Sequence, residues 1–209
     1  MKNIFISSAC PFLLLILSAC SEKESATNDA NIKNNTAISD SDAWIQLFDG
    51  NDLDHWNTTG DANWIVEDDT VSANSGSGML VSKIPYADFH LTLDFWVDKP
   101  ANSGVFIRCL EASNITASNC YEVNIFDTRP DQTYRTGGIV DIAPPNSIVN
   151  AADQWNRYEI IAKGSRLTVK LNDILMVDTE DTKFSEGVIA LQYGTGVVKF
   201  RNIAINHTL

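Results

Sequence analysis

Short runs in which apolar residues recur at every second position follow one another along the chain from residue 44 onward. This spacing is typical of β-strands with one buried face, and no stretch after residue 44 has the i, i+3, i+4 apolar spacing of a helix. The hairpin-type pair Asn172-Asp173 separates two of these runs. Short strands without helices predict an all-β sandwich or barrel. The expected strands are 64–66, 79–82, 89–97, 103–109, 121–126, 158–162, 166–171, 174–178, 187–192 and 197–205.

The beginning of the chain is predicted to be an export signal rather than part of this domain. Lys2 precedes an apolar stretch from Ile4 to Leu17, which is the layout of a secretory signal peptide. The following Ser18-Ala19-Cys20 matches the bacterial lipobox, so residues 1–19 are expected to be a lipoprotein signal peptide and Cys20 the lipidated residue. The alternatives are an ordinary signal peptide with a chance cysteine and a membrane-spanning helix, for which the apolar run is short.

Residues 20–42 are expected to be a flexible tether between the lipid and a folded domain at 43–209. Residues 21–42 are rich in Ser, Asn, Asp, Thr and Ala and contain no aromatic residue. Such a composition buries too little apolar surface to offset the entropy lost on ordering. Ser21, in place of an aspartate after Cys20, favours the outer membrane of a Gram-negative cell. We therefore expect an exported, lipid-anchored protein.

Charge and cysteine content restrict the partners and the redox compartment. The net charge of −12 argues against a nucleic-acid partner, and acidity alone does not define a metal site. Within the expected domain only Cys109 and Cys120 remain, and they flank the connection between two predicted strands. A disulfide there would agree with export. Two free thiols are the alternative, and a zinc site is disfavoured because no histidine lies nearby.

Two neighbouring strands carry the candidate chemistry. If 103–109 and 121–126 pair, alternation places Arg108, Glu122 and Asn124 on one polar face. These groups could orient a polyhydroxylated ligand, and Glu122 could transfer a proton. The alternative is a cross-strand ion pair on a solvated face, worth about 0.2–1 kcal/mol.

Motifs in a fixed order from residue 44 to 205 are similar to those of a known family. The resemblance is to the bacterial 3-keto-disaccharide hydrolase domain. It implies a concanavalin A-like jelly roll of two antiparallel sheets. The motifs are LFDGNDLDHW (47–56), WIVED (64–68), NSGVFIR (102–108), YEVNIFD (121–127), TGGI (136–139), QWNRY (154–158), GVIALQYG (187–194) and VKFRNI (198–203).

The resemblance also implies an activity, namely hydrolysis of glycosides that carry a ketone at carbon 3. The ketone acidifies the proton on carbon 2, a base removes it, and the group on carbon 1 leaves by elimination before water adds. This route needs a proton-transfer group and a positive group at the enolate oxygen. Placed on this sequence, Glu122 is the proton-transfer group and Arg108 stabilises the enolate, with a divalent metal ion left open as a cofactor.

The remaining candidate substrate-binding residues carry amide, carboxylate or aromatic side chains. Asp127 has a turn-capping alternative, and Trp155 has a packing alternative. Tyr193 stands where many family members have histidine, and alternation points it away from Gln192. Two non-catalytic hypotheses stay open, a carbohydrate-binding lipoprotein and a structural lipoprotein of the envelope. The candidates are Asn102, Asn124, Asp127, Trp155 and Gln192.

Overall fold

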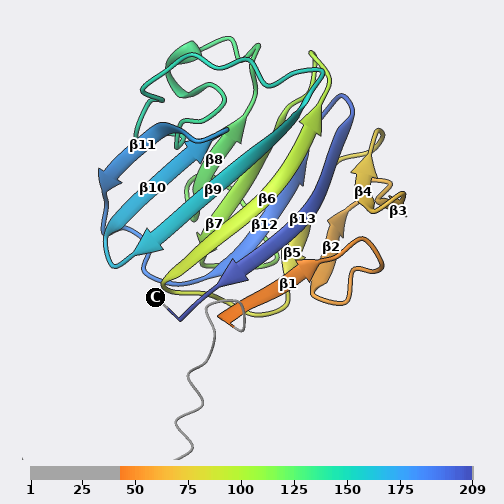
Figure 1. Cartoon of the computed structure of the whole chain (residues 1–209), viewed down its shortest axis with the longest axis horizontal. Helices are drawn as coiled ribbons and strands as arrows, with labels where there is room; N and C mark the ends of the chain where they lie inside the picture. The colour runs from red at the N-terminus through yellow and green to blue at the C-terminus, as the bar shows by residue number, and fades with distance from the viewer. Residues whose placement is uncertain (1–42, 209) are drawn as a thin grey trace, which may run out of the picture. The chain divides into compact units, whose positions relative to one another are not determined.

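Two antiparallel β-sheets face each other in the computed structural model, which describes residues 43–208 (Figure 1). The predicted all-β sandwich is therefore confirmed. The expected signal peptide, Cys20 and the tether lie outside the described residues. Within residues 43–208, no helix is long and apolar enough to span a membrane.

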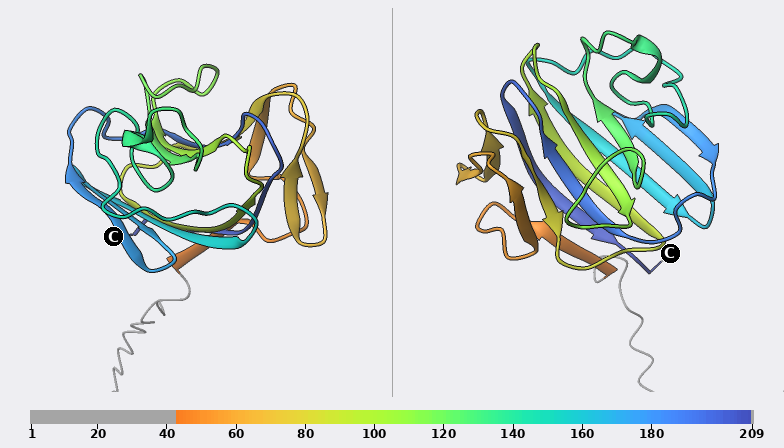
Figure 2. Two further views of the ribbon diagram at one scale, coloured as in Figure 1. Left: turned by 90° about the horizontal axis from the view of Figure 1, so that it is seen from above. Right: turned by 180° about the vertical axis from the view of Figure 1, so that it is seen from behind.

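The larger sheet has eight strands and the smaller has five, and Figure 2 shows them as two layers. A short 3-10 helix, η2 (Gln132–Tyr134), follows β8. The larger sheet runs β11 (Ile174–Glu180), β10 (Arg166–Leu171), β9 (Trp155–Lys163), β6 (Phe89–Val97), β13 (Val198–Asn206), β4 (Thr70–Ala73) and β3 (Ile65–Glu67), with β1 (Trp44–Phe48) also pairing with β13. The smaller sheet runs β2 (Trp56–Gly60), β5 (Gly78–Ser82), β12 (Val188–Tyr193), β7 (Ser103–Cys109) and β8 (Tyr121–Ile125).

All the strands expected from alternation are present, with ends shifted by up to three residues, and three further strands were missed. In β1 a register shift between Gln46 and Phe48 breaks the alternation, and β2 is an edge strand in which only Trp56 is buried. The third, β4, is a short strand within a segment rich in Ser, Asn and Asp. The predicted turn at Asn172-Asp173 is confirmed, because both residues have the positive φ that such a hairpin turn requires.

The core lies between the two sheets and is filled by the inward face of each strand. Leu91, Leu93 and Phe95 of β6 are fully buried, and they belong to the same apolar cluster as Val105 and Ile107 of β7. Removing such side chains from water contributes about 1.5–3 kcal/mol each. This burial is what fixes which face of each strand points outward.

The predicted disulfide is confirmed. Cys109 and Cys120 are joined, with their Cα atoms 4.2 Å apart, and they close the loop between β7 and β8. A crosslink over this sequence separation of 11 is expected to stabilise the fold by roughly 3 kcal/mol through loop-closure entropy.

Arg108 does not lie on the predicted polar face, and this expectation was wrong. It has φ of +52°, and the pairing of β7 with β12 shifts register beside it, between Val188 and Ala190. This bulge breaks the alternation. The guanidinium, in a side chain that is 1% exposed, reaches the β9–β10 turn of the opposite sheet, where Nη1 donates to the Gly164 carbonyl at 2.8 Å.

We expect Arg108→Met to lower the free energy of unfolding by about 3–5 kcal/mol, because it leaves several buried carbonyls and Asp88 without their donor. Chemical denaturation of the two proteins measures the difference. Arg166→Met is the matched control, since Arg166 forms an exposed ion pair with Asp178 and its loss should change stability little. Equal stability of the Arg108→Met variant and the wild type would contradict the structural role of Arg108.

Candidate functional site

The outer face of the five-stranded sheet brings together several of the predicted site residues. The pairing of β7 with β8 sets Gly104 opposite Asn124 and Phe106 opposite Glu122. On the other side of β7, Ala190 pairs with Phe106. Phe106 and Ala190 belong to a small apolar cluster separate from the main core, so these positions face outward.

Two further predicted residues reach the same face. Gln192 follows Ala190 by two positions on β12, and Asn102 precedes Gly104 by two positions. The backbones of Asn102 and Gly194 are hydrogen-bonded, with the Gly194 N–H donating to the Asn102 carbonyl at 3.0 Å. Gly104 is therefore surrounded by polar side chains, and we call this set the Gly104 face: Asn102, Glu122, Asn124 and Gln192 around Gly104.

Gly104 allows the Glu122 side chain to lie close against strand β7. A Cβ atom at Gly104 would lie 3.3 Å from Glu122 Oε1 and 3.4 Å from Phe106 Cε2. Such contacts are tighter than ordinary van der Waals packing, so a side chain at this position would displace the carboxyl group. The glycine thus fixes where the Glu122 carboxyl can sit.

The same close packing changes the acidity of Glu122. The pKa of Glu122 is raised from 4.5 to about 7, chiefly by burial, with the positive charge of Arg129 lowering it and the negative charge of Asp141 raising it. Near neutral pH both protonation states are populated, which is what a proton-transfer group needs.

Two buried acceptor atoms on the Gly104 face have no hydrogen-bond partner among the described residues. They are Asn124 Oδ1 and Gln192 Oε1. The Asn124 amide nitrogen donates to the Tyr134 carbonyl, which fixes the orientation of that amide. An unsatisfied buried acceptor costs about 1–3 kcal/mol. Both atoms are covered in this structure, and Asn124 is only 1% exposed, so a ligand hydroxyl would reach them only after neighbouring groups move.

Asp127 is not a member of this face, and its turn-capping alternative describes its position. Its Oδ1 accepts from Thr136 Oγ1 at 2.6 Å, and its Oδ2 accepts from the backbone N–H groups of Ala151 and Ala152 at 2.7 and 3.0 Å. Arg135 lies 3.5 Å from Oδ1. These donors occupy the carboxylate and hold together distant parts of the connection between β8 and β9, so the structure does not place Asp127 as a substrate-binding residue.

Trp155 also lies away from the Gly104 face. It belongs to β9 in the eight-stranded sheet, where it is directly opposite Trp96. The Arg201 guanidinium carbon lies 3.9 Å from the centroid of its ring. Sequence alternation predicts on which face of a strand a residue lies, but not which sheet the strand joins. It therefore could not place Trp155. The packing alternative therefore describes Trp155, and the structure does not bring it together with the other candidate substrate-binding residues.

Tyr193 points away from Gln192, as alternation predicted. Its side chain is buried, and its hydroxyl donates to the Gly196 carbonyl at 3.0 Å. Its ring packs edge-to-face against Trp64, with the centroids 6.4 Å apart. Tyr193, which stands where many family members have histidine, is therefore a packing residue in this structure.

The segment after β8 supplies residues that the sequence did not single out. Arg129 has its guanidinium carbon 5.9 Å from the Tyr134 ring centroid, and it acts on the pKa of Glu122 together with Asp141. The sequence of this segment has no alternation or spacing that would have predicted the effect of Arg129 on Glu122. Among residues 43–208, no group of three or more His, Cys, Asp or Glu side chains is placed to hold a metal ion.

Comparisons with known proteins agree with the fold and the motif order. The sequence model of the family described as the 3-keto-α-glucoside-1,2-lyase-like domain matches residues 43–206. A curated 3-keto-disaccharide hydrolase from Bacteroides thetaiotaomicron is 25% identical over 146 residues, which cover 54% of this chain and 50% of that protein. The chain thus spans about half the length of this curated relative.

Solved structures show the same architecture. A candidate glycosyl hydrolase from Parabacteroides distasonis has a TM-score of 0.71 at 18% identity, covering 79% of this chain and 94% of that one. The carbohydrate-binding module CBM66 from Bacillus subtilis has a TM-score of 0.57 at 19% identity, covering 71% and 93%. At these identities the likeness shows the fold alone.

We expect Glu122→Gln to stabilise the protein at pH 8 more than at pH 4. Because the pKa of Glu122 is about 7 in the folded state and near 4.5 when unfolded, its stabilising contribution is complete below pH 4.5 and is lost as the pH rises through 7. Gln does not titrate, so the difference in unfolding free energy should grow by roughly 2–3 kcal/mol over this range. Denaturation at several pH values measures it, and a constant difference would contradict the raised pKa.

Proposed function

The chain belongs to the 3-keto-α-glucoside-1,2-lyase-like domain family, and from this premise we propose that it cleaves glycosidic bonds of 3-keto-glycosides by elimination and hydration. The family and the relatives support a glycoside hydrolase-like or carbohydrate-binding role. The finer assignment, including the 3-keto substrate, is our proposal.

One observation carries the proposal: a half-buried carboxyl with a pKa of about 7 lies on a face with two unpartnered acceptors. A base with this pKa is present in the ionised form at neutral pH and can still accept a proton. The acceptors Asn124 Oδ1 and Gln192 Oε1, which are covered in this structure, would bind hydroxyl groups of the sugar once neighbouring groups move aside. The groups proposed to bind the sugar and the group proposed to transfer the proton thus lie on the same face.

The reaction can be written with this chain's own groups. The Glu122 carboxylate removes the proton from carbon 2, which the neighbouring ketone acidifies, and the electron pair moves into the enolate. The enolate then re-forms the ketone as the carbon 1–oxygen bond breaks, leaving an unsaturated ketone, and the protonated Glu122 can return the proton to the departing oxygen. Water adds across the double bond to give the free 3-keto sugar.

The positive group at the enolate oxygen cannot be Arg108, because its guanidinium is buried between the sheets. We assign this role to Arg129, whose charge already acts on the Glu122 carboxyl. Its guanidinium stacks on Tyr134 and forms no ion pair within residues 43–208, and we propose that it turns toward the ketone when substrate binds. Arg129 would then stabilise negative charge as it develops in the transition state.

We expect Glu122→Gln to abolish release of a chromogenic group from a 3-keto-glucoside while leaving ligand affinity within about tenfold. Gln keeps the shape and hydrogen-bonding ability of the side chain but cannot take a proton. The test measures turnover of the full chain beside Tyr193→Phe, which removes a hydroxyl outside the face. Equal turnover by the wild type and the Glu122→Gln variant would exclude Glu122 as the base.

The same assay has a predicted pH dependence. With a base of pKa about 7, kcat/KM should rise about tenfold per pH unit below neutrality and level off above it. A profile that falls with rising pH would instead assign Glu122 as a general acid in the rate-limiting step.

Carbohydrate binding without chemistry is the second candidate, and the two unpartnered acceptors favour it as much as they favour catalysis. It is distinguished by the same variant. A binding protein would show no release by the wild type, and Glu122→Gln would only weaken its affinity for plain oligosaccharides.

We also propose that the protein acts at the cell envelope, anchored through Cys20. This proposal rests on the apolar stretch and lipobox at the start of the sequence. We expect Cys20→Ala to move the protein from the membrane fraction to the soluble fraction, as measured by fractionation of expressing cells. Persistence of this variant in the membrane fraction would contradict lipidation at Cys20.

A further inference from the structure

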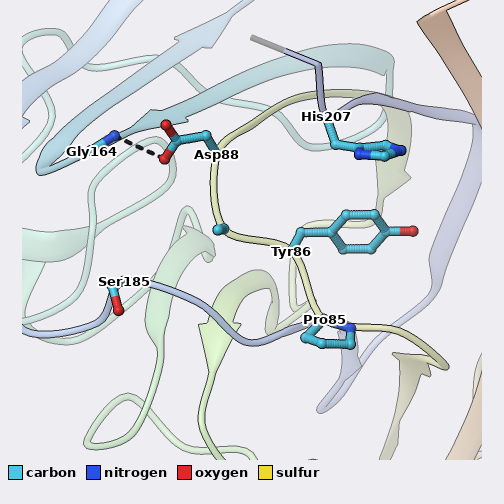
Figure 3. A pocket seen from close by; sticks show the side chains of 7 residues that line it. Pro85, Tyr86, Asp88, Gly164, Ser185 and His207 are labelled. Atoms are coloured by element: carbon cyan, nitrogen blue, oxygen red, sulfur yellow. Dashed lines mark hydrogen bonds between the residues drawn. The ribbon is translucent and has the colours of Figure 1, made fainter.

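A cavity of about 570 Å³ lies at one end of the sandwich (Figure 3). Its walls come from four separate parts of the chain: the segment 85–88, the β9–β10 turn at Gly164, the β11–β12 loop at Ser185, and His207 after β13. None of these residues belongs to the Gly104 face. The volume falls within the range that ligand pockets occupy.

The buried Arg108 side chain forms hydrogen bonds with three of these four parts of the chain. Its Nε donates to the Ala87 carbonyl at 2.8 Å, and its Nη1 donates to the carbonyls of Gly164 and Phe184 at 2.8 and 3.1 Å. Its Nη2 lies 3.1 Å from Asp88 Oδ1. Each of these partners either lines the cavity or precedes a residue that does.

Burying an arginine to hold loops together costs free energy of desolvation. Well-packed apolar side chains of similar volume often give equal or greater stability than a buried ion pair. What the arginine adds is a fixed geometry for the polar atoms around it. Asp88 Oδ1 accepts both from Arg108 and from the Gly164 N–H at 2.9 Å, so the carboxylate cannot rotate freely.

The walls present two kinds of surface. On one side Asp88 keeps a second carboxylate oxygen with no hydrogen bond from the described residues, and its side chain is 42% exposed. Figure 3 shows Ser185 on another wall and the Tyr86 and His207 rings facing one another. The centroids of these two rings are 6.0 Å apart. A ligand would therefore meet a fixed acceptor, a hydroxyl and the exposed His207 ring, because Tyr86 is only 4% exposed and packs in the main core.

We propose that this cavity is a second carbohydrate-binding site that takes a neutral sugar residue. A carboxylate accepts hydrogen bonds and donates none, so the ligand must offer O–H groups. The exposed His207 ring suits the C–H face of a sugar ring. Arg108 neutralises the charge of Asp88, so a cationic ligand has no net attraction to the site. This second site is separate from the site of the proposed reaction, because it shares no residue with the Gly104 face.

The test is direct binding to the full chain. Maltose, trehalose, cellobiose and sucrose at millimolar concentrations are the probes, and the amide signals of Gly164 and Ser185 in the ¹⁵N-labelled protein report on the cavity. At least one probe should shift both signals in a saturable way. His207→Ala should weaken that binding about tenfold, because it removes the exposed ring of the Tyr86–His207 pair, and Asp88→Asn should weaken it by a similar factor.

Two controls make the outcome specific. His55→Ala removes another exposed histidine, and Glu122→Gln disables the proposed reaction, and neither should change the affinity measured at Gly164 and Ser185. No saturable shift with any probe, or unchanged affinity in the His207→Ala variant, would overturn the proposal. A shift at Gly164 that Glu122→Gln abolishes would also overturn it, because the binding would then belong to the Gly104 face. Failure of the 3-keto-glucoside assay leaves this result unaffected.

Discussion

The register of β7 against its two neighbours determines which polar side chains can meet. Antiparallel pairing sets Gly104 opposite Asn124 and Phe106 opposite Glu122, and β12 brings Gln192 to the same face. A one-residue slip would turn all of these side chains into the core. Burial of the opposite face of β7 in the main cluster holds the register.

The bulge at the end of β7 separates an outward-facing part of the strand from an arginine that points inward. Up to Phe106 the strand contributes to the outer face, and at Arg108 a positive φ sends the next long side chain between the sheets. There it connects the loops that build the cavity at the end of the sandwich. Bulges commonly redirect a side chain in this way, so this local break in the ladder places Arg108 inside, while regular pairing of β7 with β8 keeps Glu122 outside.

The Gly104 face carries groups that reduce stability. An ionised Glu122 is unfavourable where burial raises its pKa, and two acceptors lack partners. A protein that only needed to fold would gain by replacing them with paired or apolar groups. The extensive core between the sheets can offset this cost, which is consistent with a face kept for binding and chemistry.

The sequence by itself indicated ten of the thirteen strands, the all-β class, a disulfide between Cys109 and Cys120, and Glu122, Asn102, Asn124 and Gln192 as candidate site residues, because alternation, turn residues and motif order are local properties of the chain. It did not determine the positions of Arg108, Asp127 and Trp155. Arg108 depends on a bulge set by pairing with β12, Asp127 on a loop more than twenty residues away at Ala151 and Ala152, and Trp155 on the sheet that β9 joins. Contacts between distant segments decide these positions, and no local pattern records them. Only the tertiary structure could therefore place the Gly104 face and the cavity behind Arg108.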